Sequence, residues 1–249
     1  MKMISIVSLG GLNFSMDLVT DFKEIIDENT EKTINSLKEI YIEVNEDKKY
    51  DFYKSISKYY TAINLWKKQL EAKLELNEKD KILLCNLNLN FCSLINCVVL
   101  GDEKLINFLY RNIIETILRF CTKEYESKDL EAMFKKICIT DNINKKKYLE
   151  KYSSQLKSIY INSCHYVHTD TSKINYDLVN LIKYKHNIEE FDLKKENNNF
   201  CKMLSIILQI LQIMYIDLFE KMKSTSKAYF YDLSDLEQRI EYKEILQSI

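Results

Sequence analysis

Apolar side chains recur at helical spacing along most of the chain. Leu109, Ile113, Ile117 and Phe120 are separated by four, four and three residues, which is the period of an α-helix with one buried face. Polar clusters, rather than prolines, mark the ends of such segments. The pattern predicts an all-α protein with helices near 15–44, 48–76, 79–99, 103–126, 128–138, 145–167, 174–186, 200–223 and 235–247.

The first 78 residues are heavily charged and carry weaker apolar stripes than the residues that follow. We therefore expect a multi-helix bundle at 79–249 with a long N-terminal helical hairpin at 1–78, and a single domain remains an open alternative. The most hydrophobic run, Met203 to Ile216, is shorter than the roughly 20 residues that cross a bilayer, which favours a central core helix. Ser234 and Glu237 have capping-box spacing, which predicts the start of the last helix.

Composition narrows the fold class further. The 249 residues include no Pro and only three Gly, so turn-rich sandwiches, barrels and Gly-rich nucleotide-binding folds are disfavoured. The net charge of −1 argues against a polycation that coats nucleic acid. The seven cysteines include no CxxC pair, which favours reduced, structural thiols in a cytoplasmic protein without a membrane span. Cys85 and Cys92 lie in an apolar run, where we expect them in the core.

One polar row carries the first candidate chemistry. Arg111, Glu115 and Arg119 stand four residues apart on a segment that is otherwise apolar, so they share one face of a helix. Two of the three arginines of the chain lie in this row, and a guanidinium recognises carboxylate or phosphate oxygens. The row therefore predicts either a phosphate-binding site or an ion-pair row within the helix.

Two of the three histidines stand at the end of another predicted helix. His165 and His168 are three residues apart, and a helix C-terminus favours the protonated imidazole. A metal site needs a third ligand, and only Asp170 is near in sequence, so we expect neither a metal nor another cofactor. A histidine that caps the helix or pairs with a buried carboxylate is the alternative.

Together the two segments resemble a pattern met in HEPN-like and abortive-infection proteins. The matching residues are Arg111 and Glu115 on one helix and Tyr160, Tyr166, Val167 and His168 on the other. The resemblance covers about residues 103–169. It implies a helical bundle that often dimerises and a metal-independent RNase of a toxin–antitoxin or antiviral defence system. The usual HEPN motif places Arg and His four to six residues apart on one helix, and this sequence departs from it.

If the protein cleaves RNA, the roles of these residues follow from their chemistry. Arg111, with Arg119, would hold the scissile phosphate, His168 would act as general acid or base with His165 as a second proton carrier, and Glu115 would orient Arg111. The partners are then RNA and a second copy or another protein. The rival interpretation is a non-catalytic helical interaction or regulatory protein, in which these residues form a buried polar network. A sensor whose anionic ligand sits between Arg111 and Arg119 is a third.

Overall fold

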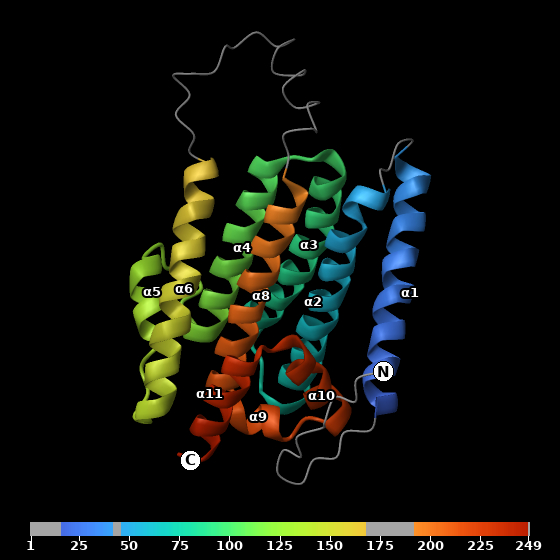
Figure 1. Ribbon diagram of the computed structural model, residues 1–249. Helices are drawn as coiled ribbons and strands as arrows, with labels where there is room; N and C mark the ends of the chain where they lie inside the picture. The colour runs from blue at the N-terminus through green and yellow to red at the C-terminus, as the bar shows by residue number, and fades with distance from the viewer. Residues whose placement is uncertain (1–15, 42–45, 168–191, 249) are drawn as a thin grey trace.

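A computed structural model describes residues 16–41, 46–167 and 192–248, and within these ranges it contains ten helices and no strand. The prediction of an all-α bundle is confirmed. The longer helices stand side by side, and the short C-terminal helices close one end of the bundle (Figure 1). The helices are α1 (Met16–Ile40), α2 (Glu46–Lys73), α3 (Glu78–Leu100), α4 (Glu103–Thr122), α5 (Leu130–Lys136), α6 (Ile143–Val167), α8 (Leu193–Met214), α9 (Ile216–Glu220), α10 (Ser224–Leu233) and α11 (Leu236–Leu246).

The central helix is α8, as its sequence predicts. Its side chains from Met203 to Ile213 are buried, apart from the half-buried Ser205. Phe200, in the same helix, lies within 6.2 Å of four aromatic rings, measured between ring centroids, and these rings come from α2, α3 and α4. One hydrophobic core thus joins α8 to the helices on both sides, and α2 packs directly on α3 and α8.

Two predicted boundaries near the C-terminus are wrong. The helix predicted at 200–223 begins at Leu193, because the Asp192 carboxylate accepts the Lys195 N–H at 2.9 Å and caps the helix there. It then ends at Met214 and is followed by α9 and α10, which the pattern did not separate. The helix predicted at 174–186 lies outside the described residues.

The predicted capping box is displaced by one residue. Asp235 accepts the Gln238 N–H at 2.8 Å and the Gln238 side chain accepts the Asp235 N–H at 3.1 Å, so these two residues form the box of α11. Ser234 instead donates to the Phe230 carbonyl and accepts a hydrogen bond from Gln209. The hydroxyl of Ser234 is therefore used between helices rather than to start one.

A two-residue turn makes α3 and α4 antiparallel neighbours. Gly101 adopts the left-handed conformation with φ of 64°, where the missing Cβ avoids a steric penalty. Its N–H donates to Val98 O, and the Asp102 N–H donates to Cys97 O, which together end α3. The Asp102 carboxylate then accepts the Leu105 N–H at 3.0 Å and starts α4.

The outward face of α3 corrects a sequence prediction. Cys85 and Cys92 are exposed, not buried, because the core face of α3 is formed instead by Leu84, Leu87 and Phe91. Within the described ranges, α3 is also the one helix long and apolar enough to cross a membrane by length and composition, and 39% of that window is buried inside the bundle.

Candidate anion-binding site

The predicted polar row lies on α4, on the flank that faces α6. The opposite face of α4 is tightly packed, with Ile113 and Ile117 buried among the other helices. Glu115 lies between the two arginines, 3.7 Å from Arg111 and 3.5 Å from Arg119, measured from Nη2 to the nearer carboxylate oxygen. These distances are ion-pair contacts that are too long for hydrogen bonds. The row is partly open to solvent, because 19% of the Arg111 side chain and 31% of the Arg119 side chain are exposed.

Helix α6 adds a tyrosine to the row. Arg111 Nη2 donates to Tyr160 OH at 3.1 Å, and this hydroxyl donates to Glu115 Oε1 at 3.0 Å. The Arg111 guanidinium also lies over the Tyr160 ring, 5.3 Å from its centroid. Burial and the neighbouring Glu115 raise the pKa of Tyr160 to about 12, although Arg111 acts in the opposite direction. Tyr160 therefore stays protonated and acts as a neutral bridge between the two charged side chains.

The charges of this cluster, which we call the arginine row, do not balance. Two guanidinium groups face one carboxylate, so the row of Arg111, Glu115 and Arg119 carries a net positive charge. The Nε atoms of both arginines are buried and have no hydrogen-bond partner among the described residues. Buried donors without partners are rare in native proteins and call for an explanation, such as an ion or a ligand that binds there.

The two histidines of the predicted site are not among the side chains that the structure describes. His165 belongs to the last turn of α6, but its side chain is outside the described part of the structure. His168 lies outside the described residues altogether. The structure thus brings together Arg111, Glu115 and Arg119, and it adds Tyr160, which the sequence analysis matched to the motif without assigning it a role. In the described ranges, no group of three or more His, Cys, Asp or Glu residues is arranged to hold a metal ion.

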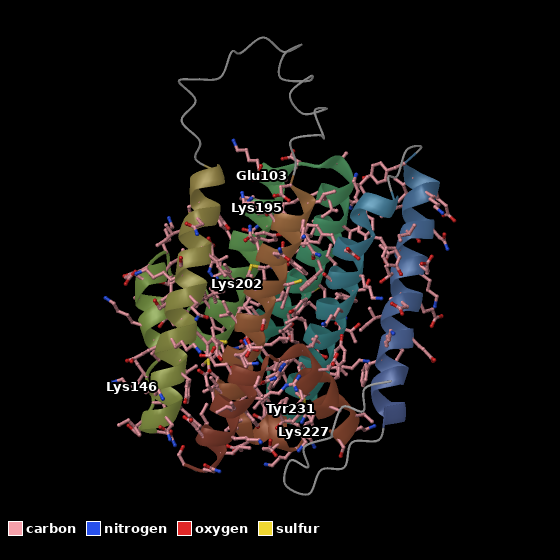
Figure 2. All side chains as sticks on the ribbon, viewed as in Figure 1. Glu103, Lys146, Lys195, Lys202, Lys227 and Tyr231 are labelled. Carbon is pink, nitrogen blue, oxygen red and sulfur yellow. The ribbon has the colours of Figure 1, made fainter. Side chains whose placement is uncertain are left out.

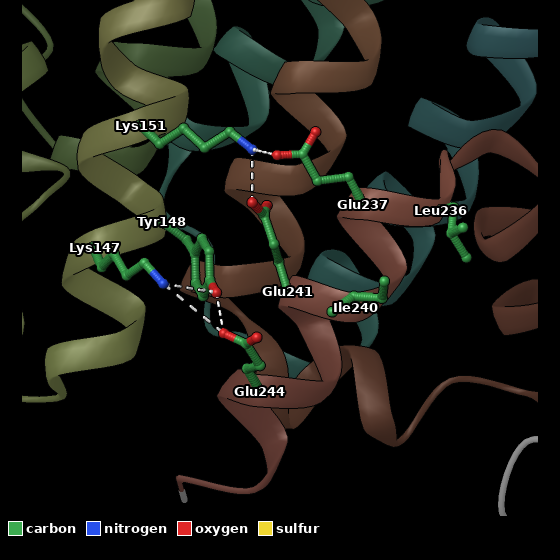
Figure 3. A pocket seen from close by; sticks show the side chains of 8 residues that line it. All are labelled: Lys147, Tyr148, Lys151, Leu236, Glu237, Ile240, Glu241 and Glu244. Atoms are coloured by element: carbon green, nitrogen blue, oxygen red, sulfur yellow. Dashed lines mark hydrogen bonds and ion pairs between the residues drawn. The ribbon is translucent and has the colours of Figure 1, made fainter.

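A second polar cluster joins the first half of α6 to α11. It lines an open groove of about 690 Å³, and its dashed contacts are drawn in Figure 3. Lys151 Nζ lies 2.7 Å from Glu237 and 2.6 Å from Glu241, and Tyr152 donates to the other oxygen of Glu241. Tyr148 donates to Glu244 in the same way. No sequence pattern predicts this groove, because its two sets of residues are separated by some 90 positions and follow no known motif.

A third feature is the buried carboxyl group of Glu196, in the first turns of α8. Only 1% of the residue is exposed; Oε1 accepts from Asn199 at 3.3 Å, and Oε2 has no partner in the described part of the chain. Burial is the main cause that raises its pKa to about 7, and the nearby negative charge of Glu103 adds to the shift. Glu103 and Lys195 mark this end of the bundle in Figure 2. Lys195 acts in the opposite direction on this pKa.

Comparisons with known proteins identify no relative. No family model, curated protein or solved structure matches the chain. Its fold and the arginine row therefore have to be interpreted from this molecule alone.

Proposed function

We propose that the arginine row binds a phosphate group of RNA, in an intracellular protein of the microbial defence or toxin type that the HEPN-like resemblance implies. The observation that supports this proposal is the excess of guanidinium over carboxylate in a partly enclosed cluster. The side chains of Arg111 and Arg119 are 19% and 31% exposed, and a phosphate offers oxygens at the geometry that a guanidinium prefers.

Cleavage of RNA is the enzymatic form of this proposal. Arg111 and Arg119 would stabilise the charge that develops on the phosphate, while His168, assisted by His165, would exchange protons with the attacking 2′-hydroxyl and the leaving oxygen. Glu115 and Tyr160 would position Arg111 and take no part in proton transfer. The product would carry a 2′,3′-cyclic phosphate.

RNA binding and RNA cleavage are tested separately, with purified protein and total RNA in the presence of EDTA. We expect Arg119→Ala to weaken RNA binding at least tenfold, and Arg111→Ala and His168→Ala to abolish cleavage. Lys146→Ala removes one exposed cation from the first turn of α6, about 20 Å along the helix from Tyr160, and serves as the charge-matched control. Equal binding by wild type, Arg119→Ala and Lys146→Ala would reject the phosphate site.

A non-catalytic interaction protein is the second candidate, and one observation favours it. The hydrogen bonds that run from Arg111 through Tyr160 to Glu115 join α4 to α6, and such a network fixes the register of two packed helices. In that case the same variants would lower thermal stability and leave RNA binding unchanged. Melting curves recorded beside the binding curves therefore separate the two functions.

A further inference from the structure

The outward face of α3 carries an exposed seam with coiled-coil spacing. Ile82, Cys85, Leu89, Cys92 and Asn96 follow one another at intervals of three, four, three and four residues, and all five are exposed. Apolar residues at these intervals form the contact line of paired helices. We call these five residues the α3 seam.

The surroundings of the seam lack the charges that a solvated helix face normally carries. From residue 82 to residue 100 the sequence contains no Lys, Arg, Asp or Glu. Three more large apolar side chains are exposed where α3 ends and α4 begins, namely Leu100 at 53%, Leu105 at 43% and Phe108 at 44%. A helix face of this length without a single charge is typical of a surface that another protein covers.

The apolar area is of the size that a dimer requires. Ile82 and Leu89 are 56% and 58% exposed, and with the three residues at the turn they present on the order of 500 Å² of apolar surface. A standard interface buries about 800 Å² on each partner, of which roughly 450 Å² is apolar. The summed area is of the order that one side of such an interface buries.

We propose that the α3 seam pairs with the α3 seam of a second copy of this chain. A two-fold dimer places the same patch on both sides, and a seam with heptad spacing is complementary to itself. Asn96 ends the seam, because its side chain accepts a hydrogen bond from Tyr41 OH at 3.2 Å and donates to Cys92 O at 3.3 Å. A lipid bilayer fits this face less well, because Asn86, Ser93 and Asn96 are exposed along it and α3 is held in the bundle by α2 and α4.

The mass of the full-length protein in solution, measured by sedimentation equilibrium from 1 to 100 µM, tests the proposal. We expect a dimer for the wild type and for Ile139→Glu, which places the same charge at a residue that is 79% exposed on another surface. Leu89→Glu, at the centre of the seam, should raise the dissociation constant at least tenfold while the melting curve stays cooperative. A monomeric wild type, or equal effects of the two substitutions, would overturn the proposal.

The two exposed cysteines provide a second readout that needs no engineered residue. In either orientation of the paired helices, Cys85 or Cys92 of one copy lies within about two helical turns of a cysteine of the other. A short bismaleimide should therefore link two wild-type chains, and the link should be lost in the Cys85→Ser, Cys92→Ser double variant. If instead the wild type remains monomeric and floats with phosphatidylglycerol vesicles, while Leu89→Glu does not, the face binds lipid and the dimer is rejected.

Discussion

Helix α6 takes part in two polar clusters that differ in the number of carboxylates available to their cations. Near its start, Lys147 and Lys151 face Glu237, Glu241 and Glu244 of α11, and each lysine has a carboxylate within 3.9 Å. Near its end, Tyr160 meets two arginines that share the single carboxylate of Glu115. The lysines of the first cluster are paired with carboxylates of the protein itself, so this cluster stabilises the packing of α6 on α11. The second has one more guanidinium than carboxylate among the described residues, so charge balance, and not the mere presence of charge, separates a structural contact from the proposed binding site.

We expect the largest loss of stability from Glu241→Ala, in the cluster between α6 and α11. The substitution leaves the buried Tyr152 hydroxyl and the Lys151 ammonium group without their shared acceptor, and we expect the free energy of unfolding to fall by about 3 kcal/mol. Urea denaturation measures the change. Glu237→Ala is the control, because 72% of that side chain is exposed and its loss should cost less than about 0.5 kcal/mol. Equal losses would mean that the cluster contributes nothing beyond surface charge.

Glu196 is a third case, a buried carboxyl group in which only one of the two oxygens has a hydrogen-bond partner among the described residues. Its folded-state pKa of about 7 lies above the ordinary value of 4.5, so folding favours the protonated form. The stabilisation is fully present below pH 4.5 and is lost as the pH rises to 7, by roughly 2–3 kcal/mol. Glu196→Gln should remove this part of the pH dependence, which is obtained as the difference between the wild-type and variant stability curves.

A substitution at Glu103 tests one cause of the raised pKa of Glu196. Glu103 raises the pKa of Glu196, so Glu103→Gln should bring that pKa closer to its ordinary value and reduce the pH-dependent loss. A stability difference between wild type and Glu196→Gln that does not change from pH 5 to pH 8 would contradict the assignment.

Glu115→Gln tests the charge balance of the arginine row. Removal of this carboxylate takes away the opposing charge that the described residues supply to both guanidinium groups, so binding of orthophosphate and of single-stranded RNA should strengthen about three- to tenfold. Stability should fall by only about 1 kcal/mol, because the row is partly exposed. Isothermal titration with each ligand measures the change. Weaker binding in this variant would show that Glu115 itself supports the ligand.

Tyr160→Phe is expected to have the smallest effect. The ring keeps its edge contact with Phe134 and its position beneath Arg111, while the bridging hydroxyl is lost, and we expect about 0.5–1 kcal/mol of destabilisation. RNA affinity should stay within twofold of the wild type. A loss of more than about 3 kcal/mol in the thermal unfolding analysis would instead assign the row to helix register.

The sequence predicted most of the fold because helical period and local caps are short-range signals. It identified α4 closely and the buried run of α8 correctly, and it placed Arg111, Glu115 and Arg119 on one face. Local signals failed where another residue was available as a cap. Asp192 caps α8, which begins at Leu193 and not at the predicted residue 200, and Asp235 takes the capping position expected for Ser234.

The sequence did not predict which residues of different helices come into contact. The meeting of Arg111 with Tyr160, 49 residues later, depends on how α4 packs on α6, and no residue pattern encodes that register. The outward direction of Cys85 and Cys92 was missed for a related reason. An apolar helix whose polar positions are uncharged asparagines shows little contrast between its two faces, so its core face becomes evident only when its neighbours are in place.

The turn at Gly101 and Asp102 has a consequence for evolution and design. It sets the rotational phase of α4 against α3, so one turn holds both the arginine row and the exposed side chains of Leu105 and Phe108 in their present directions. One residue inserted inside α4 after Phe108 would turn everything beyond it by about 100°, carrying Arg111 and Arg119 away from α6. An insertion in the turn instead leaves α4 unbroken, so the arginine row keeps its direction relative to Leu105 and Phe108, and tolerance to insertions should change between neighbouring positions.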